Sequence, residues 1–388
     1  MITKVTRRFA LLATLFALIA GLVTPTAAAA TPAKPTDWST AVVNSIMSRD
    51  PSATKLGGWG YQVGFALYGA YLVYQRTHSP AYLKYIENWV DTYVDANGNI
   101  NQSFNSLDSM QAGNLLVLLY QQTKQAKYQT AAAKIRARFN TYPRTSDGGM
   151  WHSTGLTDQL WLDGTYMSMP FLLRYGNEFN DQAYAQSQAA SAVLIDASHL
   201  QAPNGLLYHA YDQNSISWQA PGTKHSPEFW CRAIGWYGMT TVDTLDNLPA
   251  TAAQRPAILT ILRNLVAGMA RYQDPKTGRW FQVVDKGSTS GNWTETSCSA
   301  MYTYVIDKSV KEGYVASSYH ANAVRGYNGV LAEVSKESNG LIDIKNICEG
   351  TDVGNLAYYL ARPRATNDPH GLGAFLVMNE EYNGNPLA

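Results

Sequence analysis

The chain has 388 residues, with 30 basic and 29 acidic side chains and a formal net charge of +1. This balance gives no electrostatic support for nucleic acid or an anionic membrane as a partner. Aromatic residues make up 12% of the chain and charged residues only 15%. That composition suits a large core and stacking on flat apolar faces of a ligand, such as those of a sugar ring.

The first 30 residues have the pattern of a secretory signal peptide. Lys4, Arg7 and Arg8 precede an apolar run over 9–23, and small residues follow it. The run is too short for a comfortable membrane span. We therefore expect residues 1–30 to be removed, and residues 31–388 to form one soluble domain that is secreted or periplasmic. We expect this domain to be a monomer.

The three cysteines, Cys231, Cys298 and Cys348, have no spacing typical of a zinc site. One disulfide is conceivable in an oxidising compartment, although a chain of this size buries a core without one. Whether any cysteines pair therefore stays open. The chain also lacks a Gly-rich phosphate loop and the HExxH and GxSxG motifs. We expect neither a metal nor another cofactor.

Apolar and amphipathic helical segments alternate along the chain. After a short helix around residues 42–47, the apolar segments lie at 58–77, 107–123, 160–176, 229–246, 295–308 and 371–382. The amphipathic segments lie at 80–94, 126–142, 182–198, 253–273 and 317–336. A helix without a polar face must be buried on most sides. The alternation therefore predicts six helical hairpins, with apolar helices inside and amphipathic helices outside.

Two arrangements of six hairpins compete, a closed (α/α)6 barrel and an open solenoid. The terminal hairpins of a solenoid need polar capping faces. Here the first and last apolar segments are as apolar as the others, which favours closure and an all-α barrel. Strand-like segments at 204–213 and 278–287 precede the fourth and fifth apolar helices. Such loops commonly build a site at one end of a barrel.

Two carboxylates near the starts of consecutive apolar helices are the candidate catalytic residues. Asp163 lies between Trp161-Leu162 and Tyr166-Met167, where an ionised group loses hydration. Asp108 lies one hairpin earlier, so both are expected at the same end of the ring. Glycoside chemistry uses such a pair. The alternative is that each only caps its helix, since Asp is a favoured N-cap residue.

Five further residues are candidates for substrate binding. His152 and His209 stand in aromatic loops, and Arg232 stands between Trp230 and Trp236. An arginine fork suits a carboxylate. For the histidines the alternative is a structural hydrogen bond, for Arg232 a stacked structural guanidinium, and for the two tryptophans a place in the core.

Seven motifs together resemble one group of enzymes. In chain order they are WGYQVGFALYG, LDSMQAGNLL, WLDGTYMSMPFLLRYG, YHAYD, SPEFWCRAIGWY, GNWTETSCSAMYTYVI and RPRATNDPHGLGAFLVMNEE. They resemble the unsaturated rhamnogalacturonyl hydrolases of glycoside hydrolase family 105 and, more distantly, the unsaturated glucuronyl hydrolases of family 88. The resemblance implies an (α/α)6 barrel without a metal, acting on pectic oligosaccharides whose terminal uronic acid is unsaturated between C4 and C5.

By this resemblance Asp163 protonates C4 and then activates a water that adds at C5, while Asp108 stabilises the cation or holds hydroxyl groups. Arg232 and the two histidines would contact the uronate carboxylate, and Trp230 and Trp236 the sugar. Preference for galacturonyl or glucuronyl substrates stays open. An ordinary glycosidase, a lyase and a non-catalytic sugar-binding barrel are the alternatives. Burial of Asp163 would raise its pKa and the helix N-terminus would lower it, and the sequence does not decide between them.

Overall fold

The computed structural model describes residues 37–214 and 218–383, so the predicted signal peptide at 1–30 lies outside the described residues. The chain from Asp37 onward forms one compact unit by itself. None of the helices in the described ranges is both long and apolar enough to cross a membrane.

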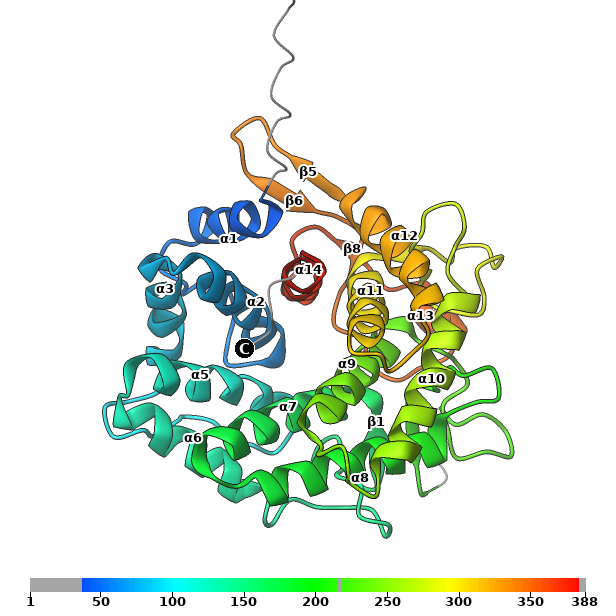
Figure 1. Ribbon diagram of the computed structural model, residues 1–388, viewed down its shortest axis with the longest axis horizontal. Coiled ribbons are helices and arrows are strands. Elements are labelled where there is room, and N and C mark those ends of the chain that lie inside the picture. The colour runs from blue at the N-terminus through cyan, green and yellow to red at the C-terminus, as the bar shows by residue number, and fades with distance from the viewer. Residues whose placement is uncertain (1–36, 215–217, 384–388) are drawn as a thin grey trace, which may run out of the picture. The chain divides into compact units, whose positions relative to one another are not determined.

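Six apolar segments form an inner ring of helices (Figure 1). They are α2 (Tyr61–Thr77), α4 with α5 (Asp108–Gln111 and Gly113–Thr123), α7 (Leu162–Phe179), α9 (Cys231–Asn247), α11 (Thr296–Lys311) and α14 (Pro369–Tyr382). Each segment packs against the next, and α14 packs against α2. The predicted closed (α/α)6 barrel is therefore confirmed, because the last inner helix meets the first.

The amphipathic segments form the outer ring, namely α1 (Trp38–Arg49), α3 (Pro80–Asp91), α6 (Ala126–Arg138), α8 (Gln182–Leu200), α10 (Arg255–Arg271) and α12 (His320–Leu331). The prediction for 317–336 was wrong at its end. A 3-10 turn, η1 (Ser317–Tyr319), leads into α12, and the helix stops at Leu331. Residues Val334–Lys336 form strand β5 because they pair with Ile342–Ile344, which is β6. The helical spacing of apolar residues in the sequence does not indicate that this segment pairs with a second strand.

Short antiparallel strand pairs line the ends of the inner helices. β1 (Gln159–Trp161) pairs with β2 (Ala210–Asp212), β3 (Trp280–Phe281) with β4 (Thr294–Glu295), and β7 (Ile347–Cys348) with β8 (Arg364–Ala365). β1 leads directly into α7, and β4 leads into α11. These pairs, with the short helix α13 (Leu356–Leu360), therefore hold loops against the end of the barrel where the inner helices begin.

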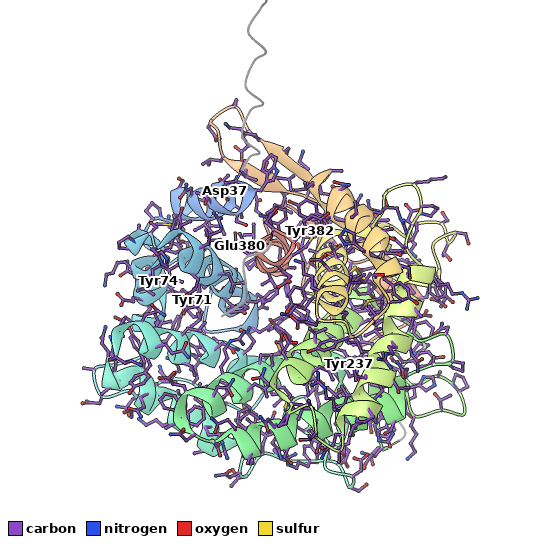
Figure 2. The ribbon with its side chains drawn as sticks, viewed as in Figure 1. Asp37, Tyr71, Tyr74, Tyr237, Glu380 and Tyr382 are labelled. Carbon is purple, nitrogen blue, oxygen red and sulfur yellow. A yellow bond between two sulfur atoms is a disulfide. The ribbon has the colours of Figure 1, made fainter. Side chains whose placement is uncertain are left out.

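The barrel closes where α2 and α14 approach each other closely at glycines. A Cβ on Gly373 would lie 2.5 Å from Phe65 Cδ1, and a Cβ on Gly69 would lie 2.6 Å from Leu376 Cβ. Farther along the same helices, Arg76 of α2 makes ion pairs with Glu380 of α14 and with Asp37, both labelled in Figure 2. Apolar packing and this ion pair therefore both join the first and last inner helices.

Replacing Gly373 with alanine is expected to lower the free energy of unfolding by about 1–3 kcal/mol, because the added methyl group overpacks the closure contact. Urea unfolding followed by circular dichroism measures the change. Gly155→Ala is the matched control, since a Cβ there would meet only Ser153 Oγ, at 3.9 Å. Equal stability of the two variants would contradict this account of closure.

Candidate active site

Asp163 lies in the first turn of α7, directly after β1, and is 9% exposed. Its Oδ2 is 2.9 Å from Nε2 of His209. The backbone around this contact is also tied down, because the Leu162 N–H donates to the His209 carbonyl over 3.0 Å. The other ring nitrogen of His209, Nδ1, is 2.7 Å from the Tyr359 hydroxyl. Asp163 therefore begins a buried chain of hydrogen bonds rather than capping its own helix.

Asp108 is the first residue of α4, and its side chain is 35% exposed. Nε2 of His152 lies 3.7 Å from its Oδ1. His152 stacks on Trp161 with ring centroids 4.3 Å apart. His209 also packs against Trp161, with ring centroids 5.6 Å apart. Trp161 therefore lies between the two histidines that face the two aspartates. The structure brings Asp108, Asp163, His152 and His209 together, as the sequence predicts.

The two aspartates have opposite electrostatic environments. Burial raises the pKa of Asp108, and the negative charge of Asp163 raises it further against the opposing effect of His152. Burial also raises the pKa of Asp163, but the charge and hydrogen bond of His209, together with His152, outweigh burial and bring it below its usual value. The pKa values of the pair are thus pushed apart, which is how neighbouring carboxyl groups take different roles.

Arg232 is almost fully buried in the first turn of α9. Its Nη1 donates to the Cys348 carbonyl, and its Nη2 donates to the Glu349 carbonyl over 2.7 Å. The guanidinium therefore supports the segment at 348–349. A contact with a substrate carboxylate finds no support in this geometry and stays a prediction.

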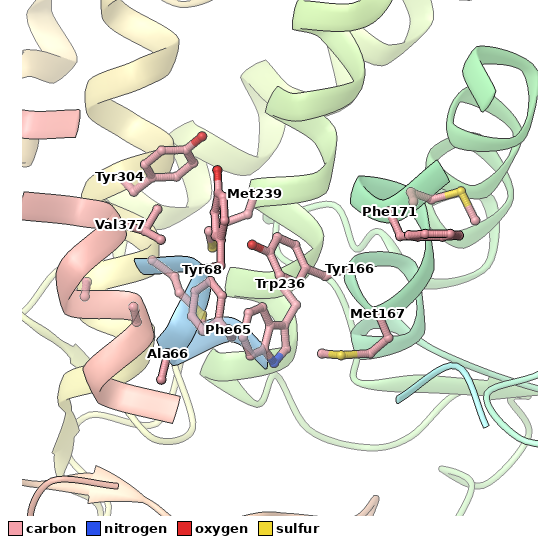
Figure 3. Packing of buried hydrophobic residues seen from close by; sticks show 14 of the residues in the cluster. Phe65, Ala66, Tyr68, Tyr166, Met167, Phe171, Trp236, Met239, Tyr304 and Val377 are labelled. Carbon is pink, nitrogen blue, oxygen red and sulfur yellow. The ribbon is translucent and has the colours of Figure 1, made fainter. Parts of the chain in front are cut away.

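The two tryptophans near Arg232 differ in their surroundings. Trp230 packs 4.6 Å from His209 and 6.0 Å from Tyr359, measured between ring centroids. Trp236 lies among Phe65 and Tyr166, at 4.7 and 4.6 Å, within the barrel core (Figure 3). Each tryptophan is 1% exposed. Trp230 therefore braces His209, and Trp236 has the core position that was its alternative; a sugar contact by either stays a prediction.

A second chain of hydrogen bonds through a histidine, which the sequence does not indicate, lies at this end of the barrel. The Tyr61 hydroxyl is 2.8 Å from Nε2 of His370, whose Nδ1 is 2.5 Å from Oδ1 of Asp368. Burial and the charge of Arg232 lower the pKa of His370 to about 4. A neutral His370 donates from Nδ1 to Asp368, so its Nε2 accepts the proton of Tyr61. Tyr61 and His370 fall inside the WGYQVG and DPHGLG motifs, but no local pattern indicates that they meet.

A disulfide joins Cys231 at the start of α9 to Cys298 in the first turn of α11, which settles the pairing that the sequence left open. Cys348 is free and buried. Glu295 caps α11 by accepting from the Ser297 and Cys298 backbone N–H groups. In the described ranges, Cys231, Cys298 and Glu295 form the one grouping of possible metal ligands, and the disulfide occupies both sulfurs.

Asp196 is a buried carboxyl on α8 that contacts the helix carrying Asp163. It accepts a hydrogen bond from Thr165 Oγ1. Burial raises the pKa of Asp196 to about 7, so from about pH 4 to pH 7 the folded protein keeps a proton that the unfolded chain releases. Its contribution to stability is full below this window and is lost as the pH rises through it. The expected loss is roughly 2–4 kcal/mol.

Urea unfolding of wild type and Asp196→Asn across this pH window tests the effect. The variant is expected to have a smaller decrease in the free energy of unfolding, because an amide does not titrate. An unchanged pH dependence in Asp196→Asn would show that the carboxyl titrates normally.

Comparisons with known proteins agree with this architecture. The model of Glycosyl Hydrolase Family 88 matches residues 38–384. The solved structure of a family 105 glycoside hydrolase from C. acetobutylicum ATCC 824 is 33% identical, with a TM-score of 0.85, and the match covers 90% of this chain and 99% of that one. The unsaturated glucuronyl hydrolase of Bacillus sp. GL1 is 12% identical with a TM-score of 0.69, covering 89% and 95% of the two chains, and shows the fold alone.

Among curated proteins, the unsaturated rhamnogalacturonyl hydrolase YesR of Bacillus subtilis strain 168 is 26% identical over 277 residues, which is 65% of this chain and 74% of YesR. The match to the family 88 model spans nearly all described residues, and the family 105 structure exceeds 30% identity over almost its whole length. The chain therefore belongs to the glycoside hydrolases of families 88 and 105.

Proposed function

We propose that this glycoside hydrolase removes a C4–C5 unsaturated uronic acid from the non-reducing end of oligosaccharides that polysaccharide lyases leave behind. The preferred substrate is the unsaturated galacturonyl group of rhamnogalacturonan lyase products. One observation carries the proposal, namely two aspartates, Asp108 and Asp163, that face His152 and His209 on either side of Trp161 at one end of the barrel. The activity of YesR, an unsaturated rhamnogalacturonyl hydrolase, supports the substrate class.

The proposed reaction adds water across the double bond. Asp163 gives a proton to C4, so positive charge develops at C5 and the ring oxygen. The Asp163 carboxylate then takes a proton from the water that adds at C5, which restores the acid. The hemiketal opens and releases the leaving sugar. In the proposed reaction the partly exposed carboxyl of Asp108 stabilises the cation or holds a hydroxyl group of the sugar.

The lowered pKa of Asp163 in the free enzyme places a condition on this reaction. A general acid must carry its proton in the substrate complex. The substrate brings its own carboxylate into the site, and a further negative charge raises the pKa of neighbouring carboxyl groups. Binding of the charged substrate therefore favours the protonated form of Asp163 at the moment when it is needed.

The unsaturated glucuronyl group is the second candidate substrate, because the motifs also resemble the unsaturated glucuronyl hydrolases of family 88, whose family model matches residues 38–384. The first 30 residues support export as part of the proposal, so the enzyme would meet its substrates in the periplasm or outside the cell. N-terminal sequencing of the exported protein, and its elution volume in gel filtration, test the cleavage site and the proposed monomer.

A panel of unsaturated disaccharides derived from galacturonyl and from glucuronyl polysaccharides tests the substrate. The unsaturated ends of the two kinds are the same group, because elimination removes the C4 stereocentre, so the panel compares the glycosidic linkage and the leaving sugar. Loss of the ultraviolet absorbance of the conjugated double bond is expected, and faster with the galacturonyl substrate. Faster loss with the glucuronyl substrate would select the second candidate. No loss with either substrate would overturn the proposed reaction, and a rise in absorbance on an intact polysaccharide would identify a lyase.

A further inference from the structure

Three buried side chains from distant parts of the sequence form a continuous chain of hydrogen bonds that ends at Asp163. The Tyr359 hydroxyl of α13 is 2.7 Å from Nδ1 of His209, and Nε2 of His209 is 2.9 Å from Oδ2 of Asp163. Tyr359 and His209 are both 0% exposed. In this structure the two side chains therefore reach the site through Asp163, and the predicted substrate contact of His209 stays a prediction.

The donors and acceptors of this chain determine where the imidazole proton lies. The Gly354 N–H donates to the Tyr359 oxygen over 3.1 Å and occupies one of its lone pairs. The ionised carboxylate of Asp163 can only accept, so Nε2 of His209, which faces it, carries a proton. In the neutral imidazole Nδ1 then carries no proton and accepts the phenol proton of Tyr359.

The residues packed around the hydrogen-bonded Tyr359, His209 and Asp163 hold these side chains in one conformation. The imidazole of His209 packs against Trp230 on one side and meets the edge of Trp161 on another. The Asn355 side chain caps α13 by accepting from the Tyr358 N–H, which anchors the helix that carries Tyr359. The His209 ring therefore has little freedom to turn and exchange its two nitrogens.

We propose that Tyr359 is a positioning residue that holds His209 with its proton on Nε2 and so keeps the hydrogen bond to the Asp163 carboxylate. The importance of this bond for turnover rests on the proposed function, in which Asp163 is an acid and then a carboxylate. No proton leaves His209 during the reaction. Its N–H stabilises the negative charge that Asp163 acquires when its proton goes to C4.

The variant Tyr359→Phe removes only the hydroxyl. With the unsaturated disaccharide, kcat is expected to fall roughly 10- to 100-fold, as for a buried hydrogen-bond partner left unpaired. KM is expected to stay within about twofold, since the Tyr359 side chain is 0% exposed. Tyr358→Phe is the matched control, because its hydroxyl binds the Asp352 N–H instead, and it should keep the wild-type kcat. In a His209→Gln background, which keeps a donor toward Asp163, Tyr359→Phe is expected to add little.

A spectroscopic readout tests the proposal without any substrate. Long-range 1H–15N spectra of enzyme labelled with 15N-histidine are expected to show one ring, identified by its loss in His209→Gln, with a protonated Nε2 and an unprotonated Nδ1. In Tyr359→Phe the Nδ1 signal of this ring is expected to shift. A wild-type ring protonated on Nδ1, or a Tyr359→Phe variant with an unchanged spectrum and wild-type kcat, would overturn the proposal.

The spectra also separate the two proposals. A wild-type enzyme that acts on no unsaturated uronide but shows the expected His209 signals would overturn the proposed function and leave the positioning role supported. Turnover of the disaccharide by an enzyme whose His209 is protonated on Nδ1 would support the proposed function and overturn the positioning role.

Discussion

Replacing Asp163 with Asn is expected to lower kcat on the unsaturated disaccharide by about 10²- to 10⁴-fold, the range that a positioned general acid contributes. The amide has nearly the same shape and its oxygen still accepts from Nε2 of His209, but it supplies no proton to C4. Initial rates of absorbance loss at saturating substrate measure the effect. Because the hydrogen bond to His209 is kept, the unfolding midpoint is expected to change little.

Asp158→Asn is the matched control for this substitution. Asp158 precedes β1, has a φ of 60° and lies close to the same loops, and Asn tolerates such a backbone conformation well. Wild-type kcat in this variant would show that the loss in Asp163→Asn comes from the position of the carboxyl. If Asp163→Asn kept more than about a tenth of the wild-type kcat, Asp163 would not be the proton donor.

Replacing Arg232 with Lys is expected to lower the free energy of unfolding by roughly 2–4 kcal/mol, because one ammonium group does not replace a buried fork that satisfies the Cys348 and Glu349 carbonyls. KM is expected to change less than kcat, since the loosened 348–349 segment lies before Gly354 and Tyr359. Urea unfolding and steady-state kinetics on the same preparation measure both effects.

Arg271→Lys is the control, because Arg271 is exposed at the end of α10 and only covers the Tyr272 ring. It should leave both stability and kinetics near wild type. A different outcome for Arg232→Lys, with normal stability and a KM raised tenfold or more, would mean that the guanidinium leaves the carbonyl groups and binds the substrate carboxylate, as the family resemblance implies.

The barrel was predictable because the burial of each helix determines which of its faces are apolar in the sequence. An inner helix such as α2 is surrounded by protein and is apolar on all sides, whereas an outer helix such as α3 keeps one polar face. The convergence of Asp108 and Asp163 followed from this pattern, since one full hairpin separates them. The disulfide between Cys231 and Cys298 did not follow, because it depends on how two inner helices lie side by side.

The direction of individual side chains was not predictable. Arg232 and Asp163 are both the second residue of an inner helix, yet the loop that follows β7 covers Arg232 and leaves Asp163 partly accessible. The sequence of that loop has no helical or strand-like spacing of apolar residues from which its position over Arg232 could be predicted. The contacts of His209 with Tyr359 and of Tyr61 with His370 join residues 150 and 309 positions apart, and no local pattern encodes them. The net pKa shift of Asp163 depends on these same contacts.

The most direct test of the proposed reaction is a 1H NMR time course with an unsaturated galacturonyl disaccharide in D2O. The H4 signal of the intact disaccharide is expected to disappear, deuterium is expected to enter at C4, and no free unsaturated uronic acid is expected to accumulate. Accumulation of free unsaturated uronic acid before its H4 signal decays would show ordinary glycosidic cleavage instead, and would contradict proton transfer from Asp163 to C4.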